Sequence, residues 1–205
     1  LDEIIHFANI SRNGLGYVKQ AVEENNADKF EQIDKKLVKY EEISDRIEYE
    51  IATFLNNVSN ESISEATSVK IKAMYKIIGE LESLGDSGSA VSRILSRRNS
   101  HKKTFDEATI KKLQEMIELV DCAYEVMIDN LTKAKKGSVE DISNAYNAEN
   151  HINALRNKLR DREIEDIETG EKNYQTSVYY MDIVNELERM GDFIINISED
   201  IKDSF

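Results

Sequence analysis

Apolar residues recur every three or four positions along most of this chain, the spacing that places side chains on one face of an α-helix. Short polar or glycine-containing segments interrupt the pattern five times, so it predicts six helices, three in each half of the chain. They are expected at about residues 2–24, 28–57, 62–95, 104–136, 138–169 and 173–203. Because long helices joined by short turns pack as antiparallel neighbours, the predicted fold is all-α, with two tandem antiparallel three-helix bundles over residues 1–100 and 101–205.

Short polar side chains next to the apolar runs indicate where the helices begin and end. The expected N-caps are Asp28, Ser62, Thr104 and Ser138, and Gly137 is the expected C-cap of the fourth helix. The regular spacing of these caps argues against a long fibrous coiled coil, which would not need to stop every 25 to 35 residues.

The composition agrees with long helices, since the 205 residues include no proline and only eight glycines. A net charge of −13 gives the chain no electrostatic reason to bind nucleic acid.

The one basic cluster, between Arg93 and Lys103, is interpreted as a helix C-terminus and a solvated turn; a docking patch for phosphate or acidic lipid head groups is the less favoured alternative. The longest uncharged run has ten residues, half of a membrane span, so this chain is not expected to cross a bilayer.

Cys122 is the only cysteine, which excludes an internal disulfide. A lone cysteine on a helical apolar face predicts a small core residue in a protein of a reducing compartment. A ferritin-like di-iron site needs two Glu-x-x-His motifs, and only the segment from Glu3 to His6 fits. That type of site is therefore not expected.

A seven-residue segment is repeated in the two halves of the chain. Glu80-Leu-Glu-Ser-Leu-Gly-Asp86 recurs 106 residues later as Glu186-Leu-Glu-Arg-Met-Gly-Asp192. Each copy places a Glu and an Asp four residues apart, on one helix face and about 5–6 Å from each other. The repeat predicts one helical unit written twice, with equivalent carboxylates in each copy.

The second and fifth helices add further oxygen ligands. Glu41 and Asp45 have the same spacing on the second helix, and Glu149 and Asn153 follow 108 residues later on the fifth. Like charges at this spacing destabilise a helix, and no basic residue lies between the acids of the first half. A bound cation such as Mg²⁺, Ca²⁺, Mn²⁺, Fe or Zn²⁺ would offset the repulsion. The alternative is that an acid-rich chain produces such pairs by chance on a solvated face.

The second copy of the motif, from Glu186 to Glu199, resembles the signature of PhoU proteins, and residues 80–86 resemble its first-repeat partner. Residues 156–170 and 179–188 are similar to the last two helices of the PhoU-like domain at the C-terminus of bacterial sodium/phosphate cotransporters. The resemblance covers nearly the whole chain. It implies two three-helix bundles whose E(D)-x-x-x-D motifs bind iron or zinc clusters in some members, and Mg²⁺ or Mn²⁺ in others. The implied metal ligands are Glu41, Asp45, Glu82, Asp86, Glu149, Glu188 and Asp192. Asn153 replaces an expected Asp, which predicts a weak or empty second site.

The resemblance implies a non-enzymatic, metal-binding regulatory domain of a sodium/phosphate cotransporter, on the cytoplasmic side of the inner membrane. The membrane portion of the transporter is the expected partner, and a signalling protein and a second copy of the chain are further candidates. Because the chain starts at Leu1 rather than Met, we expect a piece of a longer protein. The alternative is a free-standing PhoU regulator of the phosphate ABC transporter and its sensor kinase. Two further classes of function are alternatives. A metal-dependent enzyme is disfavoured because no histidine base or nucleophile lies in the motifs. The other alternative is a purely structural helical module with solvated acids.

Overall fold

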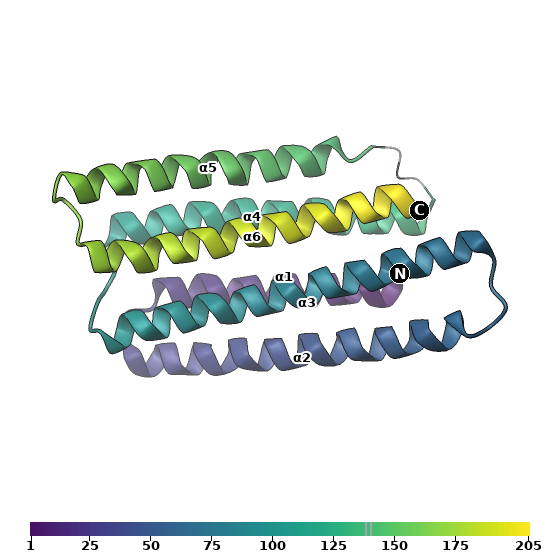
Figure 1. The fold of residues 1–205 in the computed structure, drawn as a ribbon. Helices are drawn as coiled ribbons and strands as arrows, with labels where there is room; N and C mark the ends of the chain where they lie inside the picture. Colours follow the sequence, from purple (N-terminus) through teal and green to yellow (C-terminus); the bar gives the residue numbers. More distant parts are fainter. Residues whose placement is uncertain (138, 140) are drawn as a thin grey trace.

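The computed structural model describes residues 1–137, 139 and 141–205, and these residues form six α-helices and no β-strand. The helices are α1 (Asp2–Glu23), α2 (Ala27–Ser59), α3 (Glu65–Ser100), α4 (Glu107–Lys135), α5 (Ser143–Glu168) and α6 (Tyr174–Ser204). Figure 1 shows that they lie alongside one another, with consecutive helices running in opposite directions. The all-α prediction and the number of helices are confirmed for the described part of the chain.

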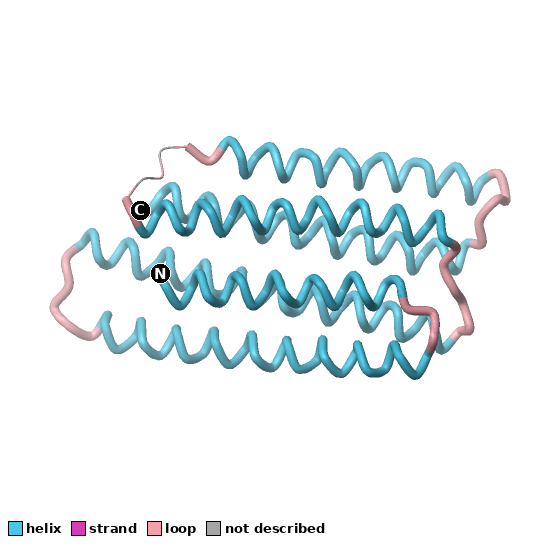
Figure 2. Tube along the Cα trace, turned by 180° about the vertical axis from the view of Figure 1, so that it is seen from behind, coloured by secondary structure: helices cyan, strands magenta, loops and turns pink. Residues whose placement is uncertain are grey.

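The helices pack in two groups of three that share one apolar core. α1, α2 and α3 contact one another, as do α4, α5 and α6, while contacts of α3 with α6 and of α1 with α4 join the groups. Figure 2 shows the same arrangement from behind. Leu81 of α3 and its repeat equivalent Leu187 of α6 are both fully buried in the continuous core. The repeated motifs therefore lie on two helices that run side by side in the middle of the molecule.

Three of the expected N-caps are wrong by two residues. The expected caps were Asp28, Ser62 and Thr104, but the structure places Asn26, Ser64 and Asp106 at the starts of α2, α3 and α4. Each of the three accepts a hydrogen bond from the backbone N–H three residues on, at 2.7–3.1 Å. Both candidates at each start have short polar side chains, so local sequence does not distinguish them, and the packing of the helix selects one. The fourth expected cap, Ser138, lies outside the described residues.

One expectation about burial is wrong. Cys122 is exposed, because its neighbours Ala123 and Tyr124 occupy the buried stripe of α4 instead. The basic cluster does lie at a helix C-terminus, since Arg97 and Arg98 belong to the last turn of α3. Arg98 is fully buried there, with its guanidinium 4.5 Å from the centroid of the Phe105 ring. No helix in the described residues is long and apolar enough to span a membrane.

Candidate metal centre

A close crossing of α2 and α3 brings the carboxylates of the first half together. At Gly85 an added Cβ would lie 2.9 Å from Ser44 Oγ and 3.0 Å from Ser44 Cβ, so only a glycine fits at this separation. Gly85 directly precedes Asp86, and Ser44 directly precedes Asp45. The glycine of the repeated motif therefore allows the two helices to approach closely enough for their aspartates to meet.

The crossing of α5 and α6 has the same construction. A Cβ at Gly191 would lie 3.1 Å from Ile152 Cδ1, and these two residues directly precede Asp192 and Asn153. The two crossings confirm that residues 106 and 108 apart in the sequence occupy equivalent places in the two groups of helices.

Three carboxylates meet at the first crossing. One oxygen from each of Asp45, Glu82 and Asp86 lies within 4.8 Å of the others, close enough for one cation to bind all three. Asp45 and Asp86 are exposed and Glu82 is partly buried, so the cluster faces solvent on one side. Of the residues predicted as ligands, these three form the candidate site.

The environment of the cluster carries excess negative charge. Burial raises the pKa of Glu82, and the nearby charges of Asp86 and Asp45 raise it further. Burial likewise raises the pKa of Asp86, with added contributions from Glu41 and Asp45. Since each raised pKa reflects a carboxylate that is costly to ionise here, a cation bound between them would be stabilised.

Glu41 and Glu48 flank this cluster along α2. Glu41 accepts a hydrogen bond from Ser89 Oγ of α3, which holds its carboxylate one turn from Asp45. Glu48 contributes to the raised pKa of Glu82. We did not predict Glu48 from the sequence, although its spacing from Glu41 and Asp45 places all three on one helix face.

The second crossing holds an arginine. Arg156 of α5 lies with its Nη2 2.9 Å from Oε1 of Glu188. Burial and the charge of Asp192 raise the pKa of Glu188, whereas Arg156 acts in the opposite direction. Glu149 accepts a 3.3 Å hydrogen bond from Asn153 instead of meeting another carboxylate. Within the described residues, Glu149, Glu188 and Asp192 do not form a cluster of three acidic ligands.

The ligand atoms at the first crossing suit a hard cation. Carboxylate oxygens suit Mg²⁺, Mn²⁺ and Ca²⁺, whereas structural Zn²⁺ sites use mainly sulfur and nitrogen. The triad of Asp45, Glu82 and Asp86 offers three such oxygens on two helices, and water could complete the coordination of an ion.

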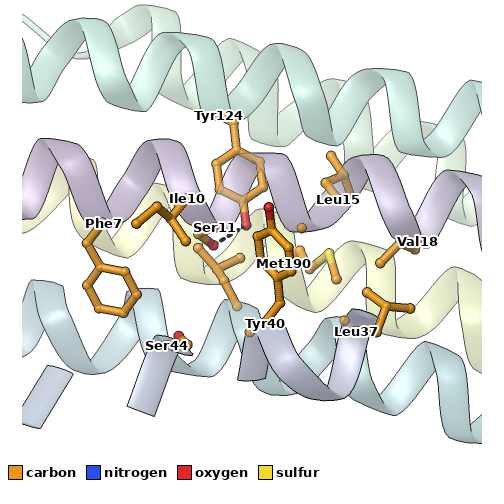
Figure 3. A pocket seen from close by; sticks show the side chains of 14 residues that line it. Phe7, Ile10, Ser11, Leu15, Val18, Leu37, Tyr40, Ser44, Tyr124 and Met190 are labelled. Atoms are coloured by element: carbon orange, nitrogen blue, oxygen red, sulfur yellow. Dashed lines mark hydrogen bonds between the residues drawn. The ribbon is translucent and has the colours of Figure 1, made fainter. Parts of the chain in front are cut away.

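The interior behind the cluster has no room for a larger ligand. Ser44 lines a cavity among α1, α2, α3, α4 and α6, drawn in Figure 3. The cavity has a volume of about 20 Å³, enough for roughly one water molecule. Ser11 and Tyr124 close its far side through a hydrogen bond of 2.8 Å. Only the outer, solvent-facing side of the crossing is therefore suited to binding an ion.

Comparisons with known proteins agree with this architecture. The family model described as the PhoU domain matches residues 113–201. The fold is similar to PhoU from Pseudomonas aeruginosa (TM-score 0.83, 12% identity, 98% of this chain and 92% of that chain). It is also similar to the phosphate transport system regulatory protein PhoU from Streptococcus pneumoniae (TM-score 0.77, 14% identity, 98% and 90%). A PhoU-like protein from Shewanella oneidensis gives a TM-score of 0.77 at 15% identity over 99% and 97% of the two chains. No curated protein sequence matches this one.

The predicted resemblance to PhoU proteins is thus confirmed by sequence over residues 113–201 and by fold over 98% of the chain. The closer resemblance to a cotransporter domain receives no support, because the three similar structures are described as PhoU or PhoU-like proteins. Residues 113–201 match the family model of the PhoU domain, and the chain as a whole has a PhoU-like all-α fold.

Proposed function

We propose that this chain is a PhoU-like regulatory protein of phosphate transport that acts by binding rather than by catalysis. The observation that carries the proposal is the PhoU domain over residues 113–201, set in a chain with the PhoU-like fold throughout. One protein of the same fold is described as a regulatory protein of a phosphate transport system. The description of that relative as a regulator agrees with the expectation that this chain is not an enzyme.

The free-standing regulator is better supported than the cotransporter domain. The three similar PhoU proteins are matched over 90% to 97% of their own length, and none is described as part of a cotransporter. In this proposal the chain works on the cytoplasmic side of the membrane and contacts a phosphate transporter. A signalling protein and a second copy of the chain stay as further candidate partners. Nucleic acid is not proposed, given the net charge of −13.

The proposal includes one metal centre per chain, at Asp45, Glu82 and Asp86. A cation there would link α2 to α3 and fix the shape of the first group of helices, because metal binding to preformed ligands adds to the stability of the fold. Arg156 makes the second crossing the poorer candidate, since a positive charge already lies against Glu188. The acidic residues at that crossing are proposed to hold the arginine rather than an ion.

Deletion of the gene in its host tests the regulatory role. Uptake of radioactive phosphate would be followed after cells grown in low phosphate are moved to high phosphate. Uptake in the wild type is expected to fall after the transfer, whereas uptake in the deletion strain should stay high and be restored by the intact gene. Normal down-regulation of uptake in the deletion strain would contradict the proposed function.

A further inference from the structure

A second group of buried polar residues lies near the turn between α5 and α6, away from the metal centre. It consists of Glu163 and Asp166 on α5 with Ser177 and Tyr180 on α6. Glu163 is 2% exposed and Tyr180 is 1% exposed. Burial of such groups costs free energy unless each polar atom finds a partner.

The equivalent place in the first group of helices is apolar. With the spacings of 108 and 106 residues that relate the two halves, the counterparts are Leu55, Val58, Ile71 and Met74. Leu55 and Ile71 are buried in the core, and Val58 and Met74 pack against it. The same fold is therefore built at this position without any polar group, so the polar cluster of the second half needs another explanation.

The pairing inside the cluster is incomplete. Ser177 Oγ donates a 2.6 Å hydrogen bond to Glu163 Oε1, but Glu163 Oε2 has no hydrogen-bond partner in the described structure. The Tyr180 hydroxyl is also buried and without a partner there. Lys112 Nζ lies 3.9 Å from Glu163 Oε2, which is too long for a hydrogen bond. One carboxylate oxygen and one phenol hydroxyl thus lack the partners that buried polar groups normally have.

Both unpaired groups line an open cleft. Its volume is about 270 Å³, slightly below the usual range of ligand pockets and suited to a molecule of a few heavy atoms. Phe105 forms part of the wall, within the segment that connects α3 to α4. Lys172 also lines the cleft, but its ammonium group is already bonded to Asp106 and to Thr109.

The charge at the cleft favours a positively charged hydrogen-bond donor. Burial raises the pKa of the Tyr180 hydroxyl, and the negative charges of Glu163 and Asp166 raise it further. Lys112 balances part of this charge through ion pairs of 3.9 Å with Glu163 and 4.0 Å with Asp166. An ammonium group in the cleft would supply the hydrogen-bond donor that Glu163 Oε2 still lacks, in a charge-assisted bond.

We propose that this cleft binds a small primary amine, whose ammonium group donates to Glu163 Oε2 while a polar group at its other end bonds the Tyr180 hydroxyl. The site is separate from the metal centre and does not depend on the proposed role in phosphate transport. Because Phe105 belongs to the segment that connects α3 to α4, the occupant would contact this connection as well as the second group of helices.

Calorimetric titration of the full chain with ethanolamine tests the proposal. Ethanolamine carries an ammonium and a hydroxyl group, and ethylene glycol is its neutral analogue of the same size. Saturable binding of one ethanolamine per chain is expected, with ethylene glycol at least ten times weaker. Equal affinity for the two compounds, or no saturable binding of ethanolamine, would overturn the amine site. An ordered water alone in the cleft, in crystals grown with saturating ethanolamine, would do so as well.

Variants locate the binding. Glu163→Gln and Tyr180→Phe are each expected to weaken ethanolamine binding at least tenfold. The exposed Glu168→Gln on the same helix should leave it unchanged. Unchanged affinity in both cleft variants would contradict the proposal.

A variant with four substitutions separates binding from folding. Glu163→Leu, Asp166→Val, Ser177→Ile and Tyr180→Met together copy the apolar residues of the first half. This variant is expected to unfold at or above the wild-type temperature and to bind no ethanolamine. A lower unfolding temperature would show that the cluster serves the fold, and retained binding would show that ethanolamine binds elsewhere. Either result would contradict the proposal.

Discussion

Arg156 of α5 occupies the place that corresponds to Glu48 of α2, and its guanidinium lies 2.9 Å from the carboxylate of Glu188. This exchange of charge adds to the replacement of Asp45 by Asn153 in distinguishing two helix crossings of the same construction. In the first half, Glu48 adds to the negative charge around Glu82. In the second half, Arg156 supplies a positive charge beside Glu188. In the first half, the basic residue that acts on the carboxylates is Arg93, which lowers the pKa of Asp86 against the effect of burial.

The substitution Glu48→Arg tests this asymmetry. It should lower the affinity of the first crossing for Mn²⁺ at least tenfold, because a fixed cation would then face Glu82. The metal-free variant should be more stable than the wild type, by about 0.3–1 kcal/mol, since an unfavourable charge contact becomes a favourable one. Calorimetric titration with Mn²⁺ and thermal unfolding in EDTA measure the two effects. Glu42→Arg, an exposed substitution on the same helix, should change the affinity much less.

The raised pKa of Asp86 predicts how stability depends on pH in the absence of metal. A carboxylate whose folded pKa exceeds its ordinary value of 3.8 binds more protons in the folded state, so the free energy of unfolding falls as the pH rises through this window. In EDTA at pH 7.5, Asp86→Asn should therefore be more stable than the wild type, by a few tenths of a kcal/mol. The difference should disappear below pH 4. Denaturant unfolding at several pH values measures it.

Asp121 supplies a control of opposite sign. Its hydrogen bonds to Arg12 lower its pKa, so its ionised form stabilises the folded state above the ordinary pKa of 3.8. Asp121→Asn should destabilise the protein at pH 7.5, by about 1 kcal/mol. The two aspartates would contradict the electrostatic account if they responded in the same direction.

Gly85→Ala should separate α2 from α3. The added Cβ would lie 2.9–3.0 Å from Ser44, and this contact cannot be relieved by a change of rotamer alone. Thermal unfolding should show destabilisation of about 1–3 kcal/mol, and Mn²⁺ affinity should fall because Asp45 and Asp86 move apart. Gly191→Ala should cost less, since Ile152 needs to shift by only a few tenths of an ångström.

Gly79→Ala is the matched control on α3. No atom lies within 4 Å of an added Cβ there, so it should stabilise the helix by roughly 0.5–1 kcal/mol. If Gly85→Ala and Gly79→Ala behaved alike, the close crossing would not be the reason for the glycine in the motif.

The helices and the motif carboxylates could be predicted because they depend on spacing along one helix. The period of apolar residues determines which face is buried, and the repeat identified Glu82 and Asp86 with their equivalents. The sequence also led to the prediction of a weak or empty second site, from Asn153, and this stays a prediction. The ion pair of Arg156 with Glu188 was missed, since we considered only basic residues between the paired acids and not those on the neighbouring helix.

The polar cluster around Glu163 was also missed, although the sequence contained a signal for it. When the two halves are compared at fixed spacings, Glu163 corresponds to Leu55 and Tyr180 corresponds to Met74. The sequence already offered both spacings, 106 and 108 residues, but we applied them only to the carboxylates of the motifs. The contacts of Gly85 and Gly191 show that both spacings hold where the helices cross. The exact starts of α2, α3 and α4 could not be predicted, because two polar residues lie two positions apart at each start. Tertiary packing determines which of them caps the helix.

The central claim is that this chain holds one metal ion, and that the ion lies at the first crossing. It is tested most directly by thermal unfolding of the EDTA-treated protein with and without Mg²⁺, Mn²⁺, Fe or Zn²⁺, beside Asp86→Ala and Asp192→Ala. With metal at a hundred times its dissociation constant, the wild type and Asp192→Ala should gain about 2.7 kcal/mol, a rise of roughly 5–10 °C. Asp86→Ala should gain nothing. A wild type that no metal stabilises, or an effect lost in Asp192→Ala and kept in Asp86→Ala, would contradict the account.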